Sequence, residues 1–303
     1  MILIITHKRD FTADYLINIL NERNIGYRRF NCEDILSVDV SFKYTPDFKY
    51  SFLGESNYSS VWFRRTMLPE IDIASFEEKK YVLGEIDNFI KNIFSVIDAK
   101  WLSKPSSVYN AENKLYQLKV AKDIGFNIPE TLITTNKQEV IAFYERKKNI
   151  IVKPISQTRI DSYNKPQFIF TSKVTSSQIE SIEAYDLTPC IFQEEIKKEL
   201  ELRVTVVKDR VFTAQVNSQQ DKETLTDWRR KKLEFTTFEL PQDQQYLCRK
   251  LLGEMDLKFG AIDLILSPDG KYTFLEINPN GQWVWIENET GLNISEAIID
   301  ELS

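Results

Sequence analysis

The alternation of apolar and polar positions predicts a β-α-β unit at the start of the chain. An apolar run, ILIIT, covers residues 2–6, and an amphipathic stretch follows from Asp10 to a glycine stop at Gly26. YRRFN at 27–31 then has the pattern of a second strand. The first turn, THKRD, lacks the glycine-rich phosphate loop of dinucleotide-binding folds, and this argues against such a fold.

The middle of the chain changes character twice. Short β-type runs fill residues 40–70, and a long amphipathic helix is predicted over 76–99. A Pro/Ser/Asn-rich segment at 104–114 marks the predicted domain boundary, and a further helix runs from there to Gly125.

The second half of the chain is dominated by β patterns. Helices are predicted only near 241–257 and 293–302. The strand-like runs are IIVKP, QFIFTSKV, CIFQEEI, LRVTVV, RVFTAQV, FGAIDLIL and KYTFLEIN. The predicted class is therefore α/β (α+β), with a β-α-β lobe, a mixed lobe and a strand-rich lobe.

Length and charge narrow the possible partners. A chain of 303 residues exceeds one ordinary core, and its 42% hydrophobic and 28% charged content is typical of folded globular proteins. The net charge of -6 argues against nucleic acid as the main partner. Basic clusters at 27–30, 62–65 and 227–232 could bind a small anion or could simply be solvated.

The numbers of cysteines and histidines limit the kinds of metal site and catalytic site that the chain can form. Three widely spaced cysteines without a C-x-x-C motif indicate a reduced, cytoplasmic protein. No stretch has the length of a membrane span, so no membrane partner is expected. A single histidine, His7, argues against zinc sites and Ser-His-Asp hydrolysis. The remaining Lys, Arg, Asp, Glu and Asn side chains suit magnesium and phosphate.

A hairpin near the C-terminus is predicted to carry the main site. If SPDG at 267–270 forms a four-residue turn, Leu266 pairs with Lys271. Asp263 then lies opposite Phe274.

This register would bring three oxygen-bearing side chains to one sheet face. Asp263, Glu276 and Asn278 would point the same way, as a magnesium site carrying a nucleotide phosphate requires. The alternative is that the acids face solvent and Asn278 caps the turn at Pro279. Ile265 on the same face favours partial burial, where unpaired carboxylates are costly.

Two lysines could add phosphate contacts. Lys153 ends the apolar run IIVKP, where an ammonium group needs a nearby anion, and Lys114 opens the helix after the boundary segment. Each could equally be structural, and no P-loop motif is present.

These segments together resemble the ATP-grasp superfamily. The resemblance rests on ENK with Lys114, AKDIGFNIPET, IIVKP, FQEEI, ELRV, AIDLIL and FLEINPN, in this order. It implies a pre-ATP-grasp domain at 1–104, a central subdomain at 105–190, and a C-terminal subdomain at 191–303 with the metal and acceptor site. It also implies ATP and Mg²⁺.

The resemblance assigns roles residue by residue. Lys114 and Lys153 would contact phosphates, Glu201 the ribose, and Arg203 the γ-phosphate or acyl phosphate. The adenine edge would be bound by Gln193, Glu194, Glu195 and Ile196, and the metal by Asp263, Glu276 and Asn278. One departure is that residues 154–167 contain no glycine, whereas many ATP-grasp enzymes close a glycine-rich loop there.

Within the superfamily the chain is most similar to graspetide synthetases, the macrocyclases of microviridin- and plesiocin-type peptides. VWFRR at 61–65, DWRR at 227–230 and NPNGQWVWIENETGLNI at 278–294 carry this similarity. It implies a homodimer acting on a ribosomal precursor peptide with a leader segment. Asp or Glu side chains of the peptide would be activated as acyl phosphates and joined to its own hydroxyl or amine groups.

The similarity also implies an acceptor site. Arg64, Arg65 and Arg229 are forked cations suited to gripping peptide carboxylates. Arg203 and Arg229 would stabilise the tetrahedral oxyanion, with Lys153 as a further catalytic cation.

Two tryptophans complete the predicted acceptor site. Trp283 and Trp285 alternate with Val284, so in an extended chain they share a face and could form an apolar wall that contacts substrate. Alternatively, they fill the base of the last helix.

Two other functions stay open on the sequence. An ATP-grasp ligase that adds a free amino acid to a carboxylate would share every nucleotide-binding residue. A non-catalytic, nucleotide-dependent peptide-binding module would be favoured by loss of Arg203 or the metal set, but all of these residues are present.

Overall fold

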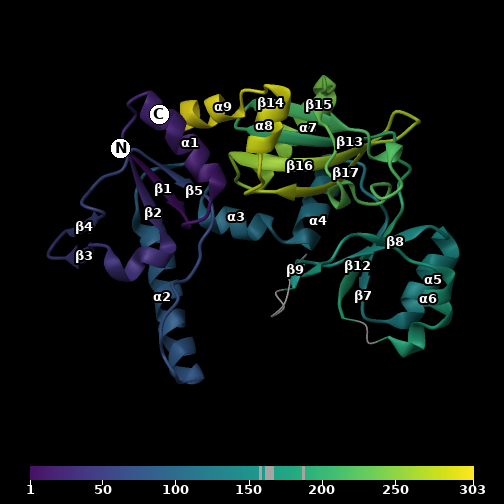
Figure 1. Cartoon of the computed structure of the whole chain (residues 1–303), viewed down its shortest axis with the longest axis horizontal. Coiled ribbons are helices and arrows are strands. Elements are labelled where there is room, and N and C mark those ends of the chain that lie inside the picture. Colours follow the sequence, from purple (N-terminus) through teal and green to yellow (C-terminus); the bar gives the residue numbers. More distant parts are fainter. Residues whose placement is uncertain (157–158, 161–166, 186–187) are drawn as a thin grey trace.

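The computed structural model describes residues 1–156, 159–160, 167–185 and 188–303. Three main sheets and a long protruding helix, α2, dominate the view in Figure 1. The mixed helix-and-sheet class expected from the sequence is confirmed. Within the described ranges, no helix is long and apolar enough to cross a membrane.

The N-terminal lobe is a parallel sheet with strand order β2-β1-β5-β6. The predicted β-α-β unit is confirmed, and every residue of β1 is buried because both faces of the strand are covered. Asp10 caps α1 by accepting hydrogen bonds from the amides of Thr12 and Ala13. The elements of this lobe are β1 Ile2–Thr6, α1 Phe11–Glu22, β2 Tyr27–Asn31, β3 Val40–Tyr44, β4 Phe48–Phe52, β5 Ser60–Phe63, α2 Phe76–Val96 and β6 Lys100–Trp101.

Two short helices connect this lobe to the rest. The segment predicted as a boundary forms helix α3, Pro105–Ala111, because Pro105 at the first helical turn favours initiation. Helix α4, Lys114–Ile124, follows, and its buried Gln117 donates to the Ile277 carbonyl at 2.8 Å and accepts from the Ile277 amide at 3.1 Å. These bonds fix α4 to the C-terminal sheet, and Gly125 ends the helix with φ 109°.

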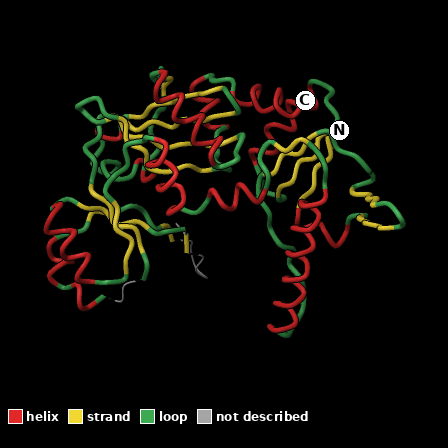
Figure 2. Tube along the Cα trace, turned by 180° about the vertical axis from the view of Figure 1, so that it is seen from behind, coloured by secondary structure: helices red, strands yellow, loops and turns green. Residues whose placement is uncertain are grey.

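The central lobe has its own sheet, with strand order β11-β8-β12-β7, and its own small core around Phe143 and Phe192. Figure 2 shows this lobe set apart from the other two sheets. Its helix α5 was not predicted from the sequence. The elements are β7 Thr131–Thr134, α5 Lys137–Lys147, β8 Ile150–Lys153, β9 Arg159–Ile160, β10 Gln167–Phe168, β11 Ser172–Lys173, α6 Ser176–Glu180 and β12 Cys190–Glu194.

The C-terminal lobe is an antiparallel sheet with strand order β15-β14-β13-β16-β17. Its last helices pack on the N-terminal lobe, since Ile4 and Leu16 share a core with Trp283 and Ile298. The two lobes therefore form one body. The elements are β13 Leu200–Val207, β14 Arg210–Val216, β15 Thr236–Thr237, α7 Gln242–Glu254, β16 Phe259–Leu266, β17 Tyr272–Asn278, α8 Val284–Thr290 and α9 Ile294–Leu302.

The predicted register of the β16–β17 hairpin is wrong by one residue. Leu266 pairs with Tyr272 instead of Lys271, because the turn contains five residues and not four. Phe274 consequently does not lie opposite Asp263.

A β-bulge nevertheless brings the acids together. Without it, the observed turn would place Leu275 opposite Asp263 and turn Glu276 to the other face. The register shifts at Asp263/Leu264, so Leu275 is passed over and Glu276 pairs directly with Asp263. The predicted common face is thus correct, but the bulge produces it.

A buried carboxylate on α9 supplies a testable stability effect. Glu301 lies 3.5 Å from Lys100, 3.3 Å from Lys208 and 3.5 Å from Lys258, which come from different strands or turns. Burial alone raises the pKa of Glu301, but these lysines together lower it below its usual 4.5.

We expect Glu301→Gln to lower the unfolding free energy by about 1 kcal/mol, a small value because the lysines are largely solvated. Since the folded pKa is the lower one, the difference from wild type should be complete above pH 4.5 and vanish as the pH falls through the folded pKa. Urea unfolding of both proteins across this range measures it. An equal difference at all pH values would contradict the electrostatic origin.

Candidate active site

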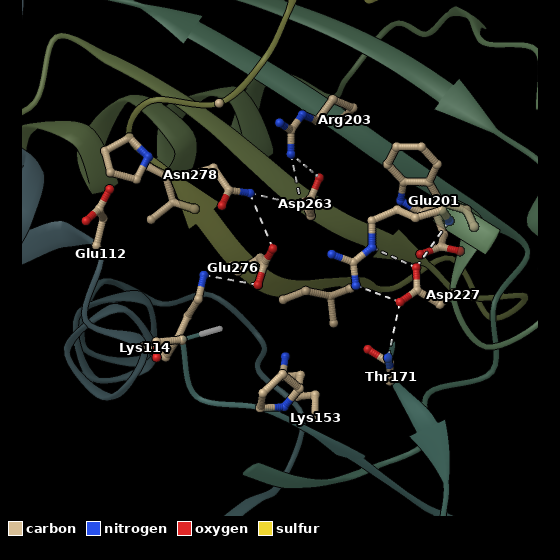
Figure 3. Close-up of a pocket in the computed structure, with 18 of the residues that line it drawn as sticks. Glu112, Lys114, Lys153, Thr171, Glu201, Arg203, Asp227, Asp263, Glu276 and Asn278 are labelled. Carbon is tan, nitrogen blue, oxygen red and sulfur yellow. Dashed lines mark hydrogen bonds and ion pairs between the residues drawn. The ribbon is translucent and has the colours of Figure 1, made fainter. Parts of the chain in front are cut away.

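A cavity of about 830 Å³ lies where all three lobes meet. Figure 3 shows part of its lining. Among the residues singled out from the sequence, Trp283 alone is absent from its wall. The singled-out residues that line it are Arg64, Arg65, Lys114, Lys153, Gln193, Glu194, Glu195, Ile196, Glu201, Arg203, Arg229, Asp263, Glu276 and Asn278.

The centre of the cavity is a carboxylate pair held by an arginine and an amide. Arg203 pairs with Asp263 across β13 and β16, and its Nη1 donates to both carboxylate oxygens at 2.8 and 3.0 Å. The Asn278 amide donates to Glu276 at 3.3 Å and to Asp263 at 3.5 Å. Burial raises the pKa of Asp263, and the nearby Glu276 carboxylate adds to the rise, although Arg203 opposes it.

Two lysines from other elements complete the charge balance. Lys114 Nζ, at the start of α4, lies 3.1 Å from Glu276 Oε2. Lys153 forms no ion pair within the described chain, and burial lowers its pKa. Burial alone would raise the pKa of Glu276, but Lys114 and Lys153 outweigh it and lower that pKa to about 2. An anionic ligand beside Lys153 would supply its missing partner.

The oxygen donors fit a hard divalent cation. The described residues contain no cluster of three His, Cys, Asp or Glu side chains, so a cation here needs an amide oxygen beside the two carboxylates. Asn278 already contacts both Asp263 and Glu276, and its Oδ1 would be the third donor. Carboxylate and amide oxygens are typical ligands of Mg²⁺.

The expected adenine edge follows the end of β12. The Glu194 carboxylate forms an ion pair with Lys147 at 2.8 Å, and the Glu195 carboxylate forms one with Lys173 at 2.6 Å. The amide of Ile196 makes no hydrogen bond within the described chain. A free main-chain donor at this position suits an aromatic base edge.

Two neighbouring polar side chains point to further ligand contacts. Gln193 is fully buried, and its Oε1 lacks a hydrogen-bond partner in the described structure. Glu201 is 7% exposed and accepts from Lys198 at 3.0 Å. Burial raises the pKa of Glu201. Both side chains are acceptors, as hydroxyl or amino groups of a nucleoside require.

The arginines of VWFRR (61–65) and DWRR (227–230) are held differently. Asp227 binds Arg229 through Nε at 2.8 Å and Nη2 at 2.6 Å, and this pairing raises the pKa of Arg229. The Thr171 amide also donates to Asp227, which fixes the pair against the central lobe. Arg65 is exposed in the cavity and has no ion-pair partner within the described chain.

Arg64, predicted to grip substrate, lies in the cavity wall but is almost entirely buried, and its Nη2 has no hydrogen-bond partner in the described structure. Its side chain is 1% exposed, Nε lies 3.3 Å from Asp10 Oδ2, and Nη1 donates to the Asn280 carbonyl at 3.4 Å. It therefore connects the cap of α1 with the loop that follows β17.

The two tryptophans do not share a face, contrary to the expectation from their alternation. Helix α8 begins at Val284, and residues two apart on a helix point in different directions. Trp283 is fully buried edge-on against Tyr15, whereas Trp285 lines the cavity beside Trp228. The apolar wall is thus formed by Trp285 and Trp228, and the position of Trp283 does not support substrate contact.

Some site residues were missed. Lys198 and Asp227 orient Glu201 and Arg229, and both lay within or beside quoted segments. The acid-to-arginine spacing in DWR was a usable signal for Asp227. The segment without glycine after Lys153, residues 154–167, lies mostly outside the described ranges.

The fold and the site together define the family. Residues 111–302 match the RimK-like ATP-grasp domain, and the chain belongs to this family. It is therefore an ATP-grasp ligase, a class of enzyme that uses ATP with Mg²⁺.

Individual relatives resemble the chain over nearly its whole length. A RiPP-associated ATP-grasp ligase of Chryseobacterium gregarium, solved with ADP and a leader and core peptide, is 31% identical, with a TM-score of 0.89 over 99% of this chain and 96% of that one. The macrocyclase MdnC of Microcystis aeruginosa, solved with the precursor peptide MdnA, is 30% identical, with a TM-score of 0.88 over 100% and 99%. The α-aminoadipate–LysW ligase LysX of Sulfurisphaera tokodaii is 23% identical over 270 residues, 86% of this chain and 87% of LysX.

Proposed function

We propose that this protein is an ATP-dependent peptide macrocyclase. It activates Asp or Glu side chains of a ribosomal precursor peptide as acyl phosphates and joins each to a hydroxyl or amine of the same peptide. The observation that carries the proposal is the likeness to two peptide-bound ligases, which covers 99–100% of this chain, the N-terminal lobe included, at 30–31% identity overall.

The first step places a peptide carboxylate against the γ-phosphate of ATP. Lys114 and Lys153 bind phosphate oxygens, and the Ile196 amide and Glu201 bind the adenine and ribose. Arg203, which is held by Asp263, would approach the transferring phosphoryl group. When bound by Asp263, Glu276 and Asn278, Mg²⁺ supplies charge neutralisation at the phosphates.

The second step replaces phosphate by the acceptor. Arg229, fixed by Asp227, and the free Arg65 hold carboxylates of an acidic peptide. Arg203 and Arg229 stabilise the oxyanion that forms when the acceptor attacks. Because donor and acceptor belong to one bound peptide, proximity lowers the barrier further.

Intact mass tests the proposal. The probe is a small acidic peptide containing Thr or Lys that is encoded beside the gene, incubated with the enzyme, ATP and magnesium. We expect one water to be lost per bond formed, with no added mass. Unchanged mass with tight peptide binding would instead support a binding module.

A second candidate rests on the likeness to LysX, whose name describes joining α-aminoadipate to LysW. An enzyme of that kind would add the mass of an amino-acid residue to its protein or peptide. The same mass experiment, repeated with free amino acids present, separates the two functions.

Further properties belong to the same proposal. We propose that the protein is a homodimer, which light scattering after gel filtration tests. We also propose that it acts in the cytoplasm, where ATP and newly made peptide are available.

We also propose functional units at 1–104, 105–190 and 191–303, with the metal and acceptor site in the last. Nucleic acid is not expected as a partner.

A further inference from the structure

The cavity contains several carboxylates, and nearly all of them are engaged. Each engaged acid has a hydrogen bond or ion pair to a neighbouring cation. These pairs are Glu194 with Lys147, Glu195 with Lys173, Glu201 with Lys198, Asp227 with Arg229, Asp263 with Arg203 and Glu276 with Lys114. Glu112 also lines the cavity, and its carboxylate has no hydrogen bond or ion pair within the described chain.

Glu112 stands in a rigid frame although its side chain is exposed. It follows the last residue of α3, where its amide donates to the Val108 carbonyl at 3.0 Å. The next residue, Asn113, caps α4 by accepting from the amides of Leu115 and Tyr116. The backbone on both sides of the carboxylate is therefore fixed, while the carboxylate itself is open to a ligand.

Glu112 lies at the end of the cavity that is assigned above to the phosphates and the metal. In Figure 3, Glu112 lies on the side of Lys114 and Asn278, whereas Glu201 and Asp227 lie on the opposite side. The titratable neighbours on this wall are Arg65, Lys114 and Tyr109. Partial desolvation of the Glu112 carboxylate by the cavity wall raises its pKa, while Arg65 and Lys114 oppose the rise. A carboxylate with a raised pKa is a better proton acceptor near neutral pH.

We propose that Glu112 is the general base of the second step, an assignment that rests on the proposed function. The acceptor hydroxyl or ammonium gives its proton to the Glu112 carboxylate. The acceptor oxygen or nitrogen then forms a bond to the acyl carbon, and the bond from that carbon to the phosphate oxygen breaks. Phosphate leaves with the electron pair of the broken bond, and with an amine acceptor it also takes up the second proton that the nitrogen loses.

Hydroxylamine separates this role from binding. It is a neutral nucleophile at neutral pH and captures acyl phosphates as hydroxamates without a base. With the same precursor peptide, ATP and magnesium, we expect Glu112→Gln to slow cyclisation about 10²-fold or more. Hydroxamate formation on the peptide, followed by mass spectrometry, should continue at the wild-type rate, because the first step does not use Glu112.

Control variants sharpen the result. Glu112→Asp retains a carboxylate, so it should recover part of the lost cyclisation. Glu254→Gln, an exposed acid at the end of α7 and outside the cavity, should match wild type. Cyclisation by Glu112→Gln at the wild-type rate, or an equal fall in both products, would overturn the assignment. A wild-type enzyme that forms neither product would overturn the proposed function and the assignment with it.

Discussion

Replacing Glu276 by glutamine should abolish ligase turnover while leaving the protein folded. The substitution keeps the shape of a side chain that pairs with Asp263 across the bulge and lies 3.1 Å from Lys114. It removes the charge that balances Lys114 and Lys153 and one of the two carboxylates available to the metal. We expect ADP release to fall by about 10³-fold, the upper range for losing one electrostatic contact at a reacting centre.

Thermal melting with and without magnesium shows whether Glu276→Gln loses activity because it no longer binds the metal. Wild-type protein should melt at a higher temperature with ATP and magnesium than with ATP alone, because ligand binding stabilises the folded state. Glu276→Gln should lose this magnesium-dependent increase, whereas Glu254→Gln should keep both the increase and the turnover. Full activity of Glu276→Gln would exclude Glu276 as a metal ligand.

The sequence predicted the strands and helices that carry strong periodicity. The β1, α1 and β2 unit, the long α2 and the final hairpin all stand where the apolar pattern places them. Helix α8 was missed because Trp283 and Trp285 read equally well as an alternating strand. Tertiary packing decides that case, since Trp283 must fill the core between α1 and the C-terminal helices.

The site shows a different limit. Residue types predicted the oxygen donors and the cations, but the register that unites Asp263 and Glu276 depends on a longer turn and a bulge. Each shifts the pairing by one residue in the same direction, and the total shift of two restores the predicted face. Neither leaves a sequence signal as clear as alternation. The burial of Arg64 was equally hidden, because its partners Asp10 and Asn280 lie far apart in sequence and meet only where two lobes pack.

The loop between β17 and α8 should be the most sensitive backbone near the site, and Gly281→Ala tests it. An added Cβ at Gly281 would lie 2.5 Å from the Ala261 Cβ and 2.8 Å from Arg203 Nη2. Ala261 belongs to β16 and pairs with Asn278, so it has little freedom to move. The loop and the Arg203 guanidinium must therefore shift, and with them the group that holds Asp263.

A displacement of this kind near reacting atoms costs about 10²-fold in rate, and we expect kcat of Gly281→Ala to fall by that amount. The matched control is Gly253→Ala in α7, where an added Cβ meets nothing within 4 Å and alanine favours the helix. It should keep full activity and melt slightly higher than wild type. If Gly281→Ala retained wild-type kcat, the position of Arg203 would be unimportant for the chemistry, and its assignment to the transferring phosphoryl group and the oxyanion would fail.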